Sequence, residues 1–134
     1  RDKLKIDPNR IFVAGNSMGG SGVSHWLRHG DKFAYGISWV GVHIPAETPQ
    51  FKESYELVVG RAQWNLPHES GLPVWQYLDD ARFLRDNPAV DTPFLAYSNG
   101  KNDGGIGWKQ AVEFTRALQE TRRPHLFVWG QNGH

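Results

Sequence analysis

The segment Ile11-Phe12-Val13-Ala14-Gly15-Asn16-Ser17-Met18-Gly19-Gly20 carries the most information about the fold of this chain. An apolar run typical of a buried strand leads into Gly15-x-Ser17-x-Gly19, and a helix-like stretch follows. The glycines on either side of Ser17 let strand and helix approach closely, so the serine stands at the tip of a sharp turn. Strand, G-x-S-x-G and helix in this order indicate a nucleophile elbow. The alternative is a glycine-rich helix start that binds an anion through its backbone N–H groups.

Length and composition limit the possible classes of protein. The chain has 134 residues, of which 39% are hydrophobic and 22% charged, as expected for one globular domain at most. A net charge of +1 gives no electrostatic case for binding nucleic acid or an anionic membrane. The absence of cysteine excludes disulfides and thiolate chemistry. No apolar run approaches the roughly 20 residues of a membrane span, and nothing indicates a compartment.

Strand-like and helix-like segments alternate along most of the chain. Strands are expected at 10–14, 35–40, 94–97 and 125–129, and helices at 18–29, 75–85 and 108–121. Gly30 is expected to end the first helix as a left-handed cap. This alternation predicts an α/β fold, a parallel sheet of about four strands with flanking helices.

Residues 43–91 break this rhythm. They hold five of the eight prolines and mixed charge, and outside 75–85 they read as irregular. We expect an insertion between the second and third strands that acts as a lid or a binding loop. Asp79 and Asp80 are expected to be solvated on its helix.

Three side chains with complementary chemistry each follow a predicted strand. A serine hydroxyl needs a base to take its proton and an acid to orient that base. Asp103 follows the third strand and His134 the fourth, so the chain order is Ser17, Asp103, His134, which is the α/β-hydrolase order. The alternatives are a turn or helix N-cap aspartate at Asp103 and a disordered terminal histidine at His134. The backbone N–H of Met18 is the expected first oxyanion donor.

Other histidines are rival candidates for site residues. His43 follows the second strand at its carboxyl end and is a candidate substrate contact. His25 and His29 are four residues apart, but no third ligand accompanies them, so no metal site is expected. The proposed chemistry requires no cofactor.

The motifs resemble those of α/β-hydrolases, and in particular prolyl-oligopeptidase-like and esterase-like members. The similar segments are Asp7-Pro8-Asn9-Arg10-Ile11 running into Gly15-x-Ser17-x-Gly19-Gly20, then Thr92-Pro93-Phe94-Leu95, Gly100-x-x-Asp103 and Gly133-His134. The resemblance covers nearly the whole chain except residues 43–74. It implies Ser17 as nucleophile, Asp103 as orienting acid and His134 as general base.

The resemblance also implies that residues 1–134 are a partial catalytic domain. They correspond to its last four strands, and the upstream half, with the second oxyanion donor, is expected as a partner. The implied function is a serine hydrolase that cleaves a carboxylic ester through an acyl-enzyme, and the alternative is a prolyl-oligopeptidase-like peptidase. Its partner would be a small-molecule ester or a peptide substrate. A catalytically silent binding domain of the same fold remains as an alternative of another class.

Overall fold

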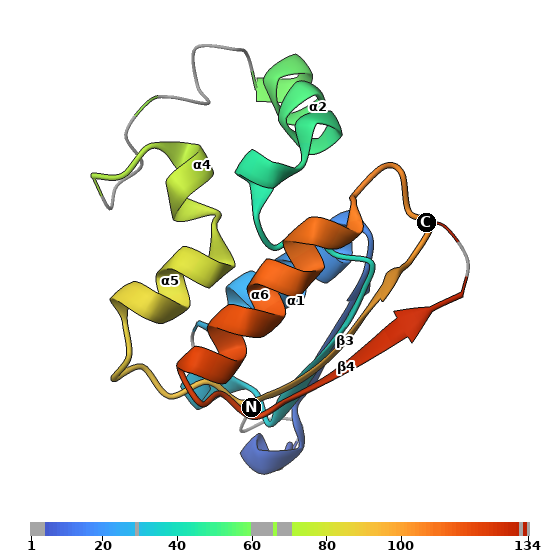
Figure 1. Cartoon of the computed structure of the whole chain (residues 1–134). Coiled ribbons are helices and arrows are strands. Elements are labelled where there is room, and N and C mark those ends of the chain that lie inside the picture. The colour runs from blue at the N-terminus through green and yellow to red at the C-terminus, as the bar shows by residue number, and fades with distance from the viewer. Residues whose placement is uncertain (1–4, 29, 60–65, 67–70, 132, 134) are drawn as a thin grey trace.

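Four parallel strands form the sheet in the computed structural model, which describes residues 5–28, 30–59, 66, 71–131 and 133. The strands are β1 (Phe12–Asn16), β2 (Tyr35–Trp39), β3 (Phe94–Gly100) and β4 (His125–Gly130), and they lie in the order β1-β2-β3-β4. Each strand pairs with the next along the chain. The predicted parallel α/β architecture is therefore confirmed (Figure 1).

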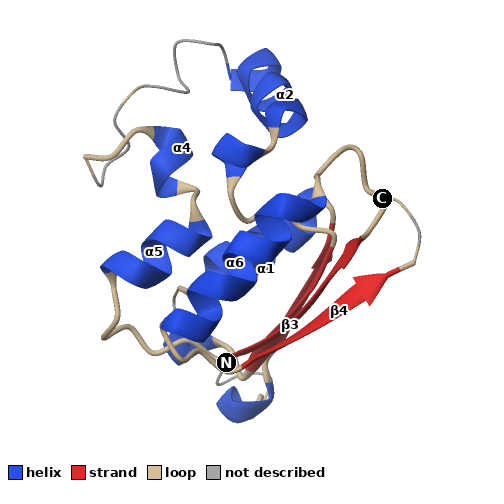
Figure 2. Ribbon diagram, in the orientation of Figure 1, coloured by secondary structure: helices blue, strands red, loops and turns tan. Residues whose placement is uncertain are grey.

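Helices cover one side of this sheet (Figure 2). The α-helices are α1 (Met18–Leu27), α2 (Pro49–Val59), α4 (Val74–Tyr77), α5 (Asp80–Asp86) and α6 (Trp108–Glu120), and short 3-10 turns lie at Pro8–Arg10, Gly30–Lys32 and Pro45–Glu47. Helices α1 and α6 lie directly over the strands, and α5 packs against α6 farther from the sheet (Figure 1).

The segment between β2 and β3 is more regular than its prolines suggested. Helix α2 occupies residues that were expected to be irregular. Pro49 does not prevent this helix, because it stands at the first helical position, where proline is tolerated. The single helix expected over 75–85 is instead two, α4 and α5. Asp79 separates them because its carboxylate accepts a bond from Arg82 N at 2.8 Å and caps α5.

Gly30 does not act as the left-handed cap that was predicted. Helix α1 ends at Leu27 with Arg28 as its C-cap, and Gly30 begins a 3-10 turn. A Cβ at Gly30 would lie 2.3 Å from the carbonyl oxygen of Asp91. Glycine is required there because two backbone segments approach each other, not because of the helix end.

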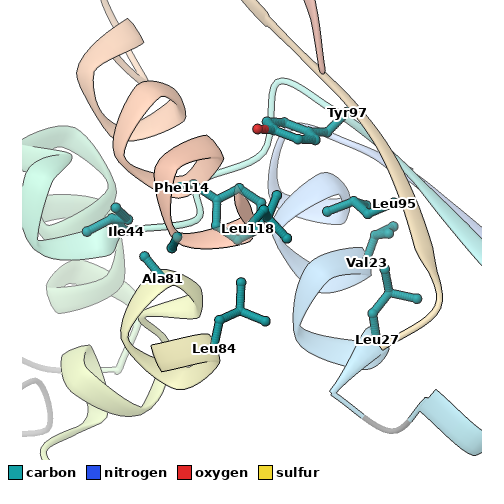
Figure 3. Close-up of a cluster of buried hydrophobic side chains, with 10 residues drawn as sticks. Val23, Leu27, Ile44, Ala81, Leu84, Leu95, Tyr97, Phe114 and Leu118 are labelled. Carbon is teal, nitrogen blue, oxygen red and sulfur yellow. The ribbon is translucent and has the colours of Figure 1, made fainter. Parts of the chain in front are cut away.

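The main core lies between the sheet and the helices. Its buried apolar side chains come from α1, α5, α6, β3 and the loop after β2, and Figure 3 shows them converging. They are Val23, Leu27, Ile44, Ala81, Leu84, Leu95, Tyr97, Phe114, Ala117 and Leu118. Because α1 contributes Val23 and Leu27, its packing is part of the same core that holds α6 in place.

The opposite face of the sheet carries exposed apolar side chains. Phe12 is 55% exposed, Leu126 52% and Val128 52%, and the strand register places them on one face with Phe94. Within the described part of the chain, β1 pairs only with β2 and is an edge strand.

Candidate active site

Ser17 lies at the junction between β1 and α1 in an unusual backbone conformation. Its φ of 52° and ψ of −119° put a non-glycine residue at positive φ, which is sterically costly for an L-residue. The turn is held in place because Ser17 N donates to the carbonyl oxygen of Trp39 at 2.8 Å. A strained serine between a strand and a helix is the geometry of a nucleophile elbow.

Two glycines leave the space that this turn needs. A Cβ at Gly15 would lie 2.3 Å from the carbonyl oxygen of Gly19, and a Cβ at Gly20 would lie 2.7 Å from that of Trp39. Contacts this short are not possible for a real Cβ, so any larger residue would push α1 away from the sheet. Met18 is the first residue of α1, where backbone N–H groups have no partner within the helix.

Asp103 is buried in the loop that follows β3. It is 3% exposed, and its Oδ1 accepts bonds from Gly105 N at 3.0 Å and Ile106 N at 2.9 Å. These bonds are those of the turn aspartate considered above, and they also hold the carboxylate at the carboxyl end of the sheet. The register sets Asn16, Trp39 and Ser98 side by side, so Ser17 and the Asp103 loop follow the same edge.

His134 lies outside the described residues, but its neighbour Gly133 is described. A Cβ at Gly133 would lie 3.5 Å from the carbonyl oxygen of Asn102, the residue before Asp103. Gly133, which follows β4 in the chain, therefore lies against the loop that bears Asp103. The roles of Ser17, Asp103 and His134 stay predictions.

His43 is buried in the interior. It is 1% exposed, its ring stacks on Phe114 with centroids 4.1 Å apart, and Nδ1 lies 3.0 Å from Ser24 Oγ. This placement does not favour the substrate contact predicted for His43. It makes the residue part of the packing between α1 and α6.

Asp80 is buried, so the expectation that it is solvated was wrong. It is 4% exposed, and Arg28 binds its Oδ1 through Nη2 at 2.6 Å and Nε at 3.1 Å. Ser24 Oγ donates to its Oδ2. Burial by itself raises the pKa of Asp80, but the Arg28 charge and the hydrogen bonds from His43 and Ser24 outweigh burial and hold the pKa below its ordinary value.

The residues around Asp80 were not recognised in the sequence, although one signal was present. Ser17, Ser21, Ser24 and Arg28 follow each other at spacings of four, three and four, which places polar groups along one side of α1. Nothing in the sequence pointed to their partners, because His43, Asp80 and Gln110 are distant along the chain.

The described residues were found to contain neither a metal-binding cluster nor a membrane-spanning helix. Among them, no group of three or more His, Asp or Glu side chains could hold a metal ion. No helix within the described ranges is both long and apolar enough to cross a membrane.

Solved structures resemble the chain in fold. A puromycin-hydrolysing peptidase of Mycobacterium tuberculosis aligns with a TM-score of 0.75 and 20% identity, over 99% of this chain and 20% of that one. An acetyl ester-xyloside bifunctional hydrolase of Caldicellulosiruptor lactoaceticus aligns with a TM-score of 0.72 and 22% identity, over 99% and 50%. The fluorophosphonate-binding serine hydrolase F of Staphylococcus aureus aligns with a TM-score of 0.71 and 25% identity, over 99% and 51%.

The chain spans only part of the length of the proteins that it resembles. It spans only 17% of the dipeptidyl peptidase 4 of Porphyromonas gingivalis and 20% of an acylaminoacyl peptidase of Pyrococcus horikoshii. No curated protein sequence matches it significantly. The model of the prolyl oligopeptidase family, however, matches residues 1–134, the whole chain. Together with the elbow at Ser17 and the parallel sheet, this match shows that the chain belongs to the prolyl oligopeptidase family of α/β-hydrolase-fold serine hydrolases.

Proposed function

We propose that the protein is a serine hydrolase in which Ser17 is the nucleophile, Asp103 the orienting acid and His134 the general base. The observation that carries the proposal is the positive φ of Ser17 at the junction of β1 and α1. A binding domain could keep this turn for its shape, but it has no need of a serine, an acid and a histidine together. The buried Asp103 and the return of Gly133 to Asn102 support the other two roles.

The reaction is acyl transfer in two stages. His134 takes the proton of Ser17 Oγ as that oxygen attacks the substrate carbonyl carbon, and a tetrahedral oxyanion forms. The bond to the leaving group breaks as His134 returns the proton to it, leaving an acyl-enzyme. Water, deprotonated by the same histidine, then attacks the acyl carbon, and the acid product and Ser17 Oγ–H are released.

The oxyanion needs donors that are already in position. We assign one to the backbone N–H of Met18, at the start of α1, where the helix dipole also favours negative charge. The second donor is expected from the upstream half of the domain. Without it, turnover would fall by about 10²–10³.

The bond we propose to be cleaved is a carboxylic ester. The same groups can attack an ester or an amide, but an amine leaving group also depends on well-timed protonation by the histidine. The similarity to a fluorophosphonate-binding serine hydrolase supports serine reactivity without choosing between the bonds. The family match favours a second candidate, cleavage of a peptide bond in the manner of a prolyl oligopeptidase-like enzyme.

The test compares the full-length protein with its Ser17→Ala variant. Short p-nitrophenyl esters and a prolyl anilide are offered side by side, and a fluorophosphonate probe measures serine labelling. Serine-dependent ester turnover supports the proposal, and preferential anilide turnover moves the assignment to a peptidase. A full-length protein that neither labels at Ser17 nor turns over either substrate would instead be a silent binding domain.

A further inference from the structure

The nucleophile helix is bonded along one side to the segment that follows β2. Ser21 Oγ accepts a bond from Val42 N at 2.7 Å, one turn beyond Ser17. Ser24 Oγ lies 3.0 Å from His43 Nδ1 and donates to Asp80. Ser17, Ser21 and Ser24 follow each other at spacings of four and three residues, so they lie on the same side of α1. This is the side that is bonded to the segment after β2.

The same segment is bonded to the elements that follow Asp103. Gln110, in the first turn of α6, accepts from His43 N at 2.9 Å and donates to Gly41 O at 3.2 Å. Thr48 Oγ1 lies 3.4 Å from the carbonyl oxygen of Ile106 and 3.3 Å from that of Ile44, and its proton can serve either acceptor. Residues 41–48 therefore lie between the nucleophile helix and the acid loop and bind both.

Near the elbow, α1 also contacts the sheet through glycine backbones, which approach closely but have no side chains that interdigitate. Gly20 lies against Gly41 so tightly that a Cβ on Gly41 would be 2.7 Å from Gly20 C. Farther along, Val23 and Leu27 pack over Gly36. Glycine surfaces have no side chain that resists sliding, so near the elbow directional hydrogen bonds add to the core packing of Val23 and Leu27 in determining the position of α1 along its axis.

Ser24, His43 and Asp80 resemble a reactive serine, histidine and acid in composition but not in geometry. Their exposures are 6%, 1% and 4%, so no substrate can reach them from outside. The same ring atom, His43 Nδ1, faces both Ser24 Oγ and Asp80 Oδ2, the latter at 3.5 Å. A proton relay needs the two ring nitrogens on different partners. This cluster therefore has no second reaction to perform.

We infer that Ser24, His43 and Gln110 are positioning residues, which hold α1 and the start of α6 in a fixed relation and so set the placement of Ser17 relative to Asp103. The inference rests on the proposed serine hydrolase function. Ser24 connects α1 to His43, and Gln110 connects His43 to the helix after the acid loop. A substitution of Ser24 or of Gln110 therefore displaces Ser17, although neither residue touches the substrate.

The test is a Ser24→Ala variant of the full-length protein, with Thr115→Val as the matched control. Ser24→Ala removes one hydroxyl from the network and leaves Arg28 paired with Asp80. Thr115→Val removes the part-buried hydrogen bond between α6 and Tyr97. Tyr97 touches the His43 ring edge-on, but this bond is not one of the hydrogen bonds that join Ser24, His43 and Gln110. Wild type and Ser17→Ala are first compared in fluorophosphonate labelling, so that failure of the proposed function is detected separately.

If the inference is correct, Ser24→Ala lowers kcat and the labelling rate by about 10- to 100-fold with little change in KM, because a small misplacement of a nucleophile is costly. Amide hydrogen exchange in α1 also rises. Thr115→Val, with a similar loss of Tm, leaves kcat and α1 exchange near wild type. Gln110→Met gives a second variant, with the same expected split. Equal effects of Ser24→Ala and Thr115→Val, or an unchanged kcat in Ser24→Ala, would overturn the inference.

Discussion

Gly15 and Gly22 lie on opposite sides of Ser17 and have very different surroundings. A Cβ at Gly15 would meet the carbonyl oxygen of Gly19 at 2.3 Å, whereas a Cβ at Gly22 would meet nothing within 4 Å. We predict that Gly15→Ala abolishes labelling of Ser17 and lowers Tm, because α1 must move. Gly22→Ala should stabilise the protein by about 0.5–1 kcal/mol, the ordinary gain of alanine over glycine in a helix. Thermal unfolding and probe labelling of both variants measure the contrast.

Asp103 combines a structural and a proposed catalytic role, and two substitutions separate them. Its Oδ1 accepts two loop N–H groups, which the amide oxygen of asparagine can also do. We therefore expect Asp103→Asn to keep Tm near wild type while kcat falls by about 10³–10⁴, as when a triad acid loses its charge. Asp103→Ala leaves those N–H groups without their acceptor and should also lower stability by about 1–3 kcal/mol. A fully active Asp103→Asn variant would contradict the catalytic assignment.

At the scale of elements, two arginines hold α5 in different ways. Arg28 joins α1 to the buried Asp80, with side chains 8% and 5% exposed, and its guanidinium lies 4.4 Å from the centroid of the Phe83 ring. Arg85 joins α5 to Glu113 and Glu120 of α6 at the surface, with side chains 37%, 35% and 49% exposed.

The two pairs should differ strongly in their effect on stability. Arg28→Gln leaves a buried carboxylate without its counter-charge and should cost about 3–5 kcal/mol. Arg85→Gln should cost about 0–1 kcal/mol, and less at high salt, because its pairs are exposed. Urea unfolding at two salt concentrations measures both. An equal loss of unfolding free energy in Arg28→Gln and Arg85→Gln would show that burial does not determine how much the Arg28–Asp80 pair contributes to stability.

The docking of α5 on α1 should also depend on pH. The pKa of Asp80 lies below its ordinary value in the folded protein, so folding favours the ionised carboxylate. Its contribution is fully present above the unfolded pKa of about 3.9, and it is lost as pH falls through the lower folded pKa. We expect the unfolding free energy to fall on acidification below about pH 4, and to fall less steeply in Asp80→Asn. Parallel slopes in the two proteins would contradict this account.

At the scale of the whole molecule, the exposed sheet face should control association. Phe12, Leu126 and Val128 are each more than half exposed on one face, and β1 is an edge strand within the described part of the chain. Apolar faces and open edges promote aggregation. We predict that residues 1–134 alone self-associate, and that Leu126→Lys with Val128→Lys reduces this association. Size-exclusion chromatography over a concentration series tests it, and a monomeric wild-type fragment would count against it.

Local patterns were sufficient to predict much of this protein. The apolar runs, the G-x-S-x-G turn and the amphipathic stretch before the last strand correctly predicted the parallel sheet, the turn at Ser17 and α6. Each of these depends on residues close together in the chain, where periodicity and glycine sterics act directly. The order of Ser17, Asp103 and His134 came from the same kind of information, and their roles remain to be tested.

Only the tertiary structure decided what distant residues do to one another. Asp80 looks like a solvated helix residue until α5 places it against Arg28, and Gly30 looks like a helix cap until Asp91 is brought against it. His43 was predicted to touch substrate, yet Phe114 and Ser24 enclose it. Burial and charge pairing depend on which segments meet in space, and no pattern within a short stretch of sequence contains that information.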